Sequence, residues 1–411
     1  MVRKNKKVTG AILGTVVEYY DYSLYGFSAG ILAEKFFPNV DKVAGLMYVF
    51  AIYAISYLAK PLGSIFFSRI GDKYGRRLSL KFTVIGIAVP TLIIGVLPDY
   101  SNIGVIATQI LIICRFFQGF FVGGEYDGAA IYVIEHLGKD YHFTASAATR
   151  ASGAFGLLLG IASTNFFNSS VFPEWGWRLP FLMSLPLTII TLHYRKYLEE
   201  TPIFIEAKNQ ELQFYDFLYL TKKHWRTILL IILFSGGFGA TYQISVIFMK
   251  QYLPIVMPDA SKVIGTISVI TATVFAFSMP IAGLIADKFG LRIITASALI
   301  STLITSTILI IAIYTKLLNL ALISSIMLAI SIAPFNGLAH GIMIGSFKPT
   351  ERYRGISLGH TIGSLLMSGT ANFICLYFMK NYEFQLFPLF YIMIFAVIAY
   401  YAINQIIKKN G

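Results

Sequence analysis

Long runs of apolar residues, separated by short polar segments, dominate the chain from end to end. A helix needs about 20 residues to cross about 30 Å of hydrocarbon. Twelve runs are long enough, and they lie near 9–34, 43–68, 78–97, 103–134, 143–167, 178–198, 225–250, 262–285, 292–314, 319–346, 354–378 and 386–406. Unpaired backbone groups are too costly in lipid, and alternation of the barrel type is absent, so each run is predicted to be a helix.

The polar segments divide these helices into two groups of six. The longest gap, 199–224, holds too few apolar residues to form a core of its own. The loop GDKYGRR at 71–77 recurs as ADKFGLR at 286–292, and both copies follow the second span of their group. We therefore expect two pseudo-symmetric six-helix bundles, 1–198 and 225–411, which are joined by a short cytoplasmic linker and share one central site.

Composition and charge agree with a membrane protein. The chain has 411 residues, of which 56% are hydrophobic and only 13% charged, so it holds more apolar surface than a soluble fold can bury. Of 33 Lys and Arg residues, 23 lie in the loops expected inside and 7 in the opposite loops. This asymmetry predicts a multi-pass protein of the plasma (inner) membrane with both termini in the cytoplasm. No loop is large enough to build a basic groove, so we expect no nucleic-acid partner.

Several other classes of function lack the residues that they need. The two cysteines, Cys114 and Cys375, both lie in apolar surroundings, so neither a disulfide scaffold nor a metal site is expected. No nucleophile with a base is evident, and we expect neither an enzyme nor a bound cofactor. A receptor would need a signalling domain, and the gap at 199–224 is too short for one. His340 and His360 lie within predicted spans and are interpreted as packing residues.

The repeated loop resembles the signature loop of the major facilitator superfamily. Further segments resemble its metabolite:proton symporter branch, which includes proline/betaine, 2-oxoglutarate, citrate and shikimate carriers. In chain order they are GTVVEYYDYSLYG (14–26), AKPLGSIFFSRIGDKYGRR (59–77), RFFQGFFVGGEYDGAA (115–130), WGWRLPFLMSLPL (175–187), LEETPIF (198–204) and SFKPTERYRGISLGHTIGSLLMSGT (346–370). The resemblance implies a transporter that works by alternating access, with one chain sufficient and a small molecule and protons as its partners. Departures from the pattern are Tyr19, Asp127 and His360, and the last two leave the substrate open.

Two carboxylates on the first span are the candidates for proton coupling. Glu18 and Asp21 are three residues apart, so they share one helix face with Tyr22 and Tyr25. Charges this deep in a bilayer are expensive, so they should face a bundle interior or a wet cavity. The alternative is a paired structural charge that sets helix packing.

Arg115 lies in the middle of the fourth span, where a permanent cation needs an acidic partner or an anionic substrate. A rise of 1.5 Å per residue places Glu18, Asp21 and Arg115 near the midplane. We therefore expect Arg115 to control proton coupling at Asp21. The alternative is a fixed structural ion pair.

Substrate contacts are predicted from the position of aromatic and amide side chains. Gln118 follows Arg115 by three residues. The resemblance adds that spans one and seven line the cavity, which makes Tyr22, Tyr25 and Tyr242 candidates for holding a quaternary ammonium group by cation–π attraction.

Charged residues of the two repeated loops are candidates for gating on the cytoplasmic side. We expect contacts among loop charges and nearby helix ends to close this side. The predicted set is Asp72, Arg76, Arg77, Glu125, Asp127, Asp287 and Arg292.

The residues and the family resemblance together favour proton-coupled symport of a small zwitterionic osmolyte such as proline or betaine. The alternative is symport of a dicarboxylate or keto acid, because Arg115 is able to bind a carboxylate. A second cation facing the cavity would favour that alternative.

Overall fold

The computed structural model describes residues 2–74, 76–123, 130, 133–134, 142–196, 217–347 and 349–410, and the regular structure among these residues is helical. The elements that correspond to the predicted spans are α1 (Val2–Phe27) with α2 (Ala29–Phe36), α3 (Lys42–Tyr74), α4 (Arg76–Val96), α6 (Val105–Val122), α8 (His142–Phe167), α9 (Leu179–Leu182) with α10 (Ser184–Arg195), α12 (Phe217–Tyr242) with η3 (Gln243–Phe248) and α13 (Met249–Val256), α14 (Ile264–Phe289), α15 (Leu291–Tyr314), α16 (Leu318–Gly337) with α17 (Ala339–Ile344), α18 (Pro349–Gly363) with η5 (Ser364–Ser368) and α19 (Ala371–Asn381), and α20 (Phe387–Asn410). Short helical turns α5 (Tyr100–Ile103), η2 (Glu174–Arg178) and η4 (Pro258–Lys262) lie between them.

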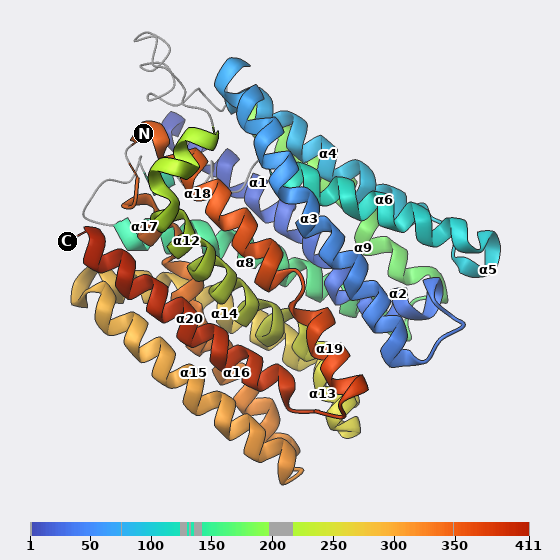
Figure 1. Ribbon diagram of the computed structural model, residues 1–411. Helices are drawn as coiled ribbons and strands as arrows, with labels where there is room; N and C mark the ends of the chain where they lie inside the picture. The colour runs from blue at the N-terminus through green and yellow to red at the C-terminus, as the bar shows by residue number, and fades with distance from the viewer. Residues whose placement is uncertain are drawn as a thin grey trace.

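Eight helices in the described part of the chain are long and apolar enough, by length and composition, to cross a membrane. Helices such as α1 and α8 fall short of that criterion because they carry polar and charged residues, several of which are buried within the bundle. Large apolar side chains remain exposed on the outer helices, for example on α14 and α15, where lipid would cover them. Figure 1 shows both ends of the chain at one end of the bundle, away from α5 and α13.

Glycines allow the helices around the centre to cross closely. The sequence predicts a close crossing for the glycine-rich segment 153–160, and the structure confirms it, since a Cβ on Gly156 would lie 2.0 Å from the carbonyl oxygen of Val16 on α1. A Cβ on Gly119 of α6 would lie 1.8 Å from the carbonyl oxygen of Ser56 on α3. Glycine permits both approaches because it has no side chain to displace.

Two helices of the second group contain a π-helical stretch. One is η3, between α12 and α13, and the other is η5, between α18 and α19. Such stretches interrupt the regular i to i−4 hydrogen bonding and are frequent at functional sites. The interruption at η5 places Ser364 and Ser368 against the central cavity described next.

Candidate functional site

A cavity of about 110 Å³ lies between the two groups of helices. Elements of both groups contribute to its wall. The lining comprises Glu18, Tyr19, Tyr22, Ser23, Tyr53, Tyr57, Lys60, Val122, Gly123, Arg150, Ala154, Phe238, Gly239, Tyr242, Phe275, Met279, Asn336, His360, Thr361, Ser364 and Ser368.

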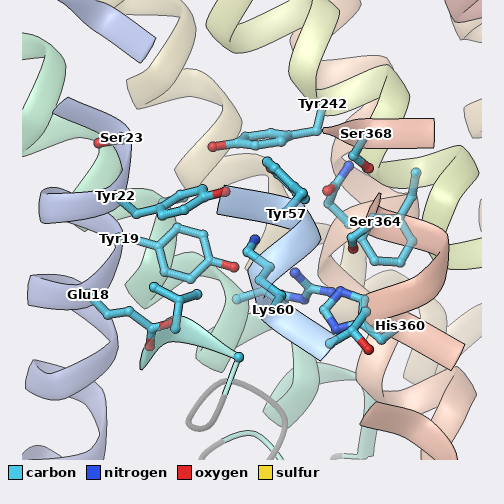
Figure 2. A pocket seen from close by; sticks show the side chains of 18 of the residues that line it. Glu18, Tyr19, Tyr22, Ser23, Tyr57, Lys60, Tyr242, His360, Ser364 and Ser368 are labelled. Carbon is cyan, nitrogen blue, oxygen red and sulfur yellow. The ribbon is translucent and has the colours of Figure 1, made fainter. Parts of the chain in front are cut away.

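The two groups of helices contribute different chemistry to this lining. Among the described residues, the carboxylate and the permanent cations of the lining all come from the first group: Glu18 from α1, Lys60 from α3 and Arg150 from α8. The second group contributes aromatic rings, hydroxyls, an amide and a histidine. Figure 2 shows Lys60 near the middle of the view, and the labelled side chains around it are Glu18, Tyr19, Tyr22 and Ser23 on one side, Ser364, Ser368 and His360 on the other, with Tyr57 and Tyr242 above.

Glu18 faces the cavity, as expected for a functional carboxylate, and its exposed fraction is 2%. It interacts electrostatically with the buried guanidinium of Arg195, at the end of α10. Gly14 of α1 makes room for this cation, because a Cβ there would lie 2.1 Å from Arg195 Nη2. Arg195 was not among the predicted site residues, so this contact was not predicted.

Asp21 lies on the same helix but does not line the cavity. Its exposed fraction is 1%, and its Oδ2 accepts a hydrogen bond of 2.8 Å from Ser184 Oγ on α10. Its Oδ1 is buried without a hydrogen-bond partner among the described residues. The two carboxylates of α1 therefore occupy separate environments, both next to α10.

Arg115 is completely buried behind the cavity wall. Its Nη1 donates to Gln118 Oε1 at 2.6 Å, and its Nη2 donates to Ser56 Oγ at 3.0 Å. Within the part of the chain that the structure describes, no carboxylate lies within ion-pair distance of this guanidinium. Arg115 and Asp21 are thus not in contact in this conformation, and the coupling role predicted for the pair stays a prediction.

The Arg115 guanidinium is instead surrounded by tyrosine rings. Its Cζ lies 4.9 Å from the ring centroid of Tyr22, 4.4 Å from that of Tyr25 and 4.8 Å from that of Tyr53. These distances are within the range of cation–π attraction. Tyr22 also lines the cavity, so its ring separates the buried cation from the space where a solute would bind.

The predicted substrate residues divide between the cavity and its surroundings. Tyr22 and Tyr242 line the cavity, and the Tyr242 ring stacks on Phe275 at a centroid distance of 5.7 Å. Tyr25 lies outside this lining, where its hydroxyl donates to the carbonyl of Val49. Gln118 also lies outside it, next to Arg115, and their substrate role stays a prediction.

Three basic residues of the lining were not among the predicted site residues. Lys60 Nζ lies 3.8 Å from the ring centroid of Tyr57 and 4.3 Å from that of Tyr22. Arg150 Cζ lies 4.9 Å from the ring centroid of Phe238. A cation inside an apolar span was the signal that identified Arg115, and the same signal marks these two residues.

His360 is the third such residue, and it lines the cavity rather than serving only as a packing residue. Its ring stacks on Phe238 at a centroid distance of 6.0 Å and lies 6.1 Å from the ring of His340. The sequence analysis interpreted it as a packing residue and as a departure from the family pattern.

One predicted gating residue makes a well-defined contact between the two groups of helices. Asp287, at the end of α14, accepts hydrogen bonds from the backbone amides of Phe143 (3.0 Å) and Thr144 (2.8 Å) and from Thr144 Oγ1 (2.6 Å). These donors are at the first turn of α8, where a helix favours an anion. Arg292 is exposed at the start of α15.

For the rest of the predicted gating set, the side chains lie outside what the structure describes. These residues are Asp72, Arg76, Arg77, Glu125 and Asp127.

Further contacts join the two groups on the other side of the cavity. Lys250 Nζ donates to Asn165 Oδ1 at 2.7 Å and to the carbonyl of Phe27 at 3.2 Å. Asn165 Nδ2 in turn donates to the carbonyl of Gly265 at 2.8 Å. This network connects helices α1, α8, α13 and α14, so the two groups of helices are also in contact at the end of α14 opposite Asp287.

Comparison with known proteins agrees with this architecture. The family model of the Major Facilitator Superfamily matches residues 11–368. The chain belongs to the major facilitator superfamily. It is therefore a membrane transporter and not an enzyme, and the family resemblance seen in its sequence is confirmed.

The superfamily members that it resembles in sequence have related names. The chain is 33% identical to a proline/betaine transporter of Salmonella typhimurium, over 96% of this chain and 81% of the relative. It is 32% identical to the proline/betaine transporter of Escherichia coli K12, with the same shares covered. It is 31% identical to a glycine betaine/proline/ectoine/pipecolic acid transporter of Dickeya dadantii, over 96% of this chain and 82% of the relative.

Solved structures show the same fold. A partially occluded, inward-open structure of the xylose transporter XylE from E. coli matches with a TM-score of 0.77 and 17% identity, over 99% of this chain and 98% of that one. Twelve transmembrane helices in two pseudo-symmetric bundles, as the sequence predicts, are the architecture of this superfamily.

Proposed function

We propose that this transporter is a proton-coupled symporter of a small zwitterionic osmolyte such as proline or betaine. One observation carries the proposal: a small central cavity is lined by a carboxylate, two cations and several aromatic rings. A zwitterion presents one charge of each sign, so such a lining is complementary to both ends of it. The names of the relatives at 31–33% identity support the same class of solute.

Coupling to protons is proposed for Glu18 and Asp21, with Arg115 acting through the tyrosines between it and the cavity. Both carboxyl groups are buried among helices, where alternating access would change their hydration and so allow each to load and release a proton. One charge moving through 100 mV yields about 2.3 kcal/mol, which supports roughly fifty-fold accumulation. Asp21→Asn should therefore lose accumulation driven by a pH gradient but keep substrate exchange, which needs no net proton movement.

The orientation in the membrane is also part of the proposal. We place the protein in the plasma (inner) membrane with both termini in the cytoplasm, acting as a single chain whose units 1–198 and 225–411 rock about the cavity. The Lys and Arg asymmetry and the position of both termini at one end of the bundle support this orientation. A cysteine introduced at Leu291 should react with an impermeant reagent only from the cytoplasmic side.

The test of the function is uptake of labelled solutes into proteoliposomes with and without an imposed pH gradient. We expect uptake of labelled proline or betaine that exceeds equilibrium only when the gradient is present. Equal uptake with and without the gradient would remove proton coupling. Absence of uptake of either solute would remove the proposed substrate class.

A second candidate function has an observation of its own. Lys60 and Arg150 bring two basic side chains to the lining of the cavity. A second cation that faces the cavity is the feature expected of a dicarboxylate or keto acid symporter. The same uptake assay with labelled succinate and 2-oxoglutarate distinguishes the two candidates.

A further inference from the structure

The ammonium group of Lys60 has a defined position in the cavity. It lies against the faces of Tyr57 and Tyr22, at centroid distances of 3.8 and 4.3 Å. The hydroxyl groups of these tyrosines are engaged elsewhere: Tyr57 accepts a 2.9 Å hydrogen bond from Gln243, and Tyr22 is 3.0 Å from Ser56 Oγ. The rings are therefore fixed, and they hold the ammonium through their faces.

This arrangement changes where the positive end of a solute is able to bind. The sequence suggested that Tyr22 and Tyr25 hold a quaternary ammonium group. In the structure, Lys60 and Arg115 both lie against the Tyr22 ring, and Tyr25 is away from the cavity. A solute cation at Tyr22 would meet two protein cations. Tyr242, which stacks on Phe275, is another aromatic surface of the lining, and it interacts electrostatically with Arg150.

Arg150 adds a second cation from a different wall. It belongs to α8, and its guanidinium lies 4.9 Å from the ring centroid of Phe238 on α12. Lysine and arginine approach the space from different helices of the first group, whereas the second group supplies no permanent charge to the described lining. A carboxylate is the solute group that interacts favourably with both, because ammonium and guanidinium groups form charge-assisted hydrogen bonds to it.

We propose that Lys60, with Arg150 as a second cation, binds the carboxylate of the transported solute. This inference rests on the proposed function, because it names the residues that select the solute. It assigns the carboxylate contact to residues of the cavity rather than to Arg115. A solute without a carboxylate should then be excluded even when its cationic end is identical.

Pairs of solutes that differ only at the carboxylate test this assignment. Betaine and choline share a trimethylammonium group, and proline and prolinamide share a pyrrolidine ring. Binding to the purified protein would be measured by thermal stabilisation, and transport by uptake into proteoliposomes. Succinate with succinamide provides a pair for the anionic alternative.

We expect Lys60→Met to weaken binding of the carboxylate member of a pair by about tenfold or more, the range expected for loss of a hydrogen bond to a charged group. Lys60→Arg should retain most of the binding, because it keeps a cation. Arg150→Met should weaken the same member. Lys35→Met is the matched control, since Lys35, in the last turn of α2, pairs with Glu174 at 3.7 Å and lies outside the cavity.

The outcomes separate this inference from the proposed function. If the parent binds succinate but neither betaine nor proline, and Lys60→Met loses succinate, the osmolyte proposal fails and the carboxylate assignment stands. If a folded Lys60→Met and a folded Arg150→Met each bind within twofold of the parent, the assignment is overturned. It is also overturned if Lys60→Arg loses binding to the same extent as Lys60→Met, or if no carboxylate stabilises the parent more than the counterpart that lacks the carboxylate.

Discussion

The contact between Asp287 and α8 makes a quantitative prediction about gating. Asp287→Asn keeps an acceptor for one backbone amide but removes the negative charge at the helix N-terminus and one of the two carboxylate oxygens that accept from Phe143 and Thr144. A capping contact contributes about 0.5–2 kcal/mol, and a charge at a helix terminus up to about 2 kcal/mol. A combined loss of about 1–3 kcal/mol shifts the ratio of closed to open states by about 5- to 150-fold.

The assay measures access to the cavity from each side of the membrane. A single cysteine at Ser364, a cavity residue, reports access in a background where the buried Cys114 and Cys375 are replaced. Its reaction with an impermeant maleimide would be compared in inside-out and right-side-out vesicles. We expect Asp287→Asn to speed labelling in inside-out vesicles only. Asp259→Asn, at an exposed position in η4, is the control and should leave the rate unchanged.

Two results would refute this reasoning. An unchanged labelling rate in inside-out vesicles would mean that the hydrogen bonds between Asp287 and α8 do not hold the cavity closed. Faster labelling in right-side-out vesicles would mean that this end of the bundle faces outward, which would also contradict the proposed orientation.

Three further predictions concern packing, the opposite gate and pH. Gly119→Ala should lower the melting temperature by several degrees, because the added Cβ would lie 1.8 Å from a backbone oxygen of α3. Gly30→Ala is the control: a Cβ there would have no atom within 4 Å, so the melting temperature should stay unchanged or rise. Lys250→Met should speed labelling of the same cavity cysteine in right-side-out vesicles, because it breaks the network that joins α13 to α1 and α8; an unchanged rate would exclude that network from gating. The hydrogen bond from Lys380 lowers the pKa of the Asp41 carboxyl, so the pair should stabilise the protein at neutral pH and lose that effect as the pH falls through the lowered pKa. Parent and Lys380→Met should therefore differ in melting temperature at neutral pH and converge in acid; a difference that persists in acid would contradict this.

The fold followed from the sequence because lipid leaves the backbone few alternatives. Each of the twelve apolar runs corresponds to a helix or a short series of helices in the structure. The duplicated loop indicated the two bundles, and the glycine spacing at 153–160 indicated the close crossing of α8 and α1. These features are properties of length, hydropathy and side-chain size, which are readable along one segment at a time.

The candidate site was only partly predictable. Glu18, Tyr22 and Tyr242 were expected at the cavity, and all three line it. Polar side chains within a span are costly in contact with lipid, so they face the interior of the bundle or a water-filled cavity. Asp287 was predicted to take part in gating; it contacts α8 of the other group, and the gating role itself stays a prediction.

Tertiary structure alone decided which of the buried charges reach the cavity. Arg115 and Arg150 are both arginines within apolar spans, yet the first is surrounded by tyrosines behind the wall and the second lines the space. Lys60, like Arg150, lines the cavity. Arg195 comes close to Glu18 because Gly14 has no side chain to block it. The direction that each side chain takes depends on the rotation and crossing of several helices, and a single helix pattern does not contain that information.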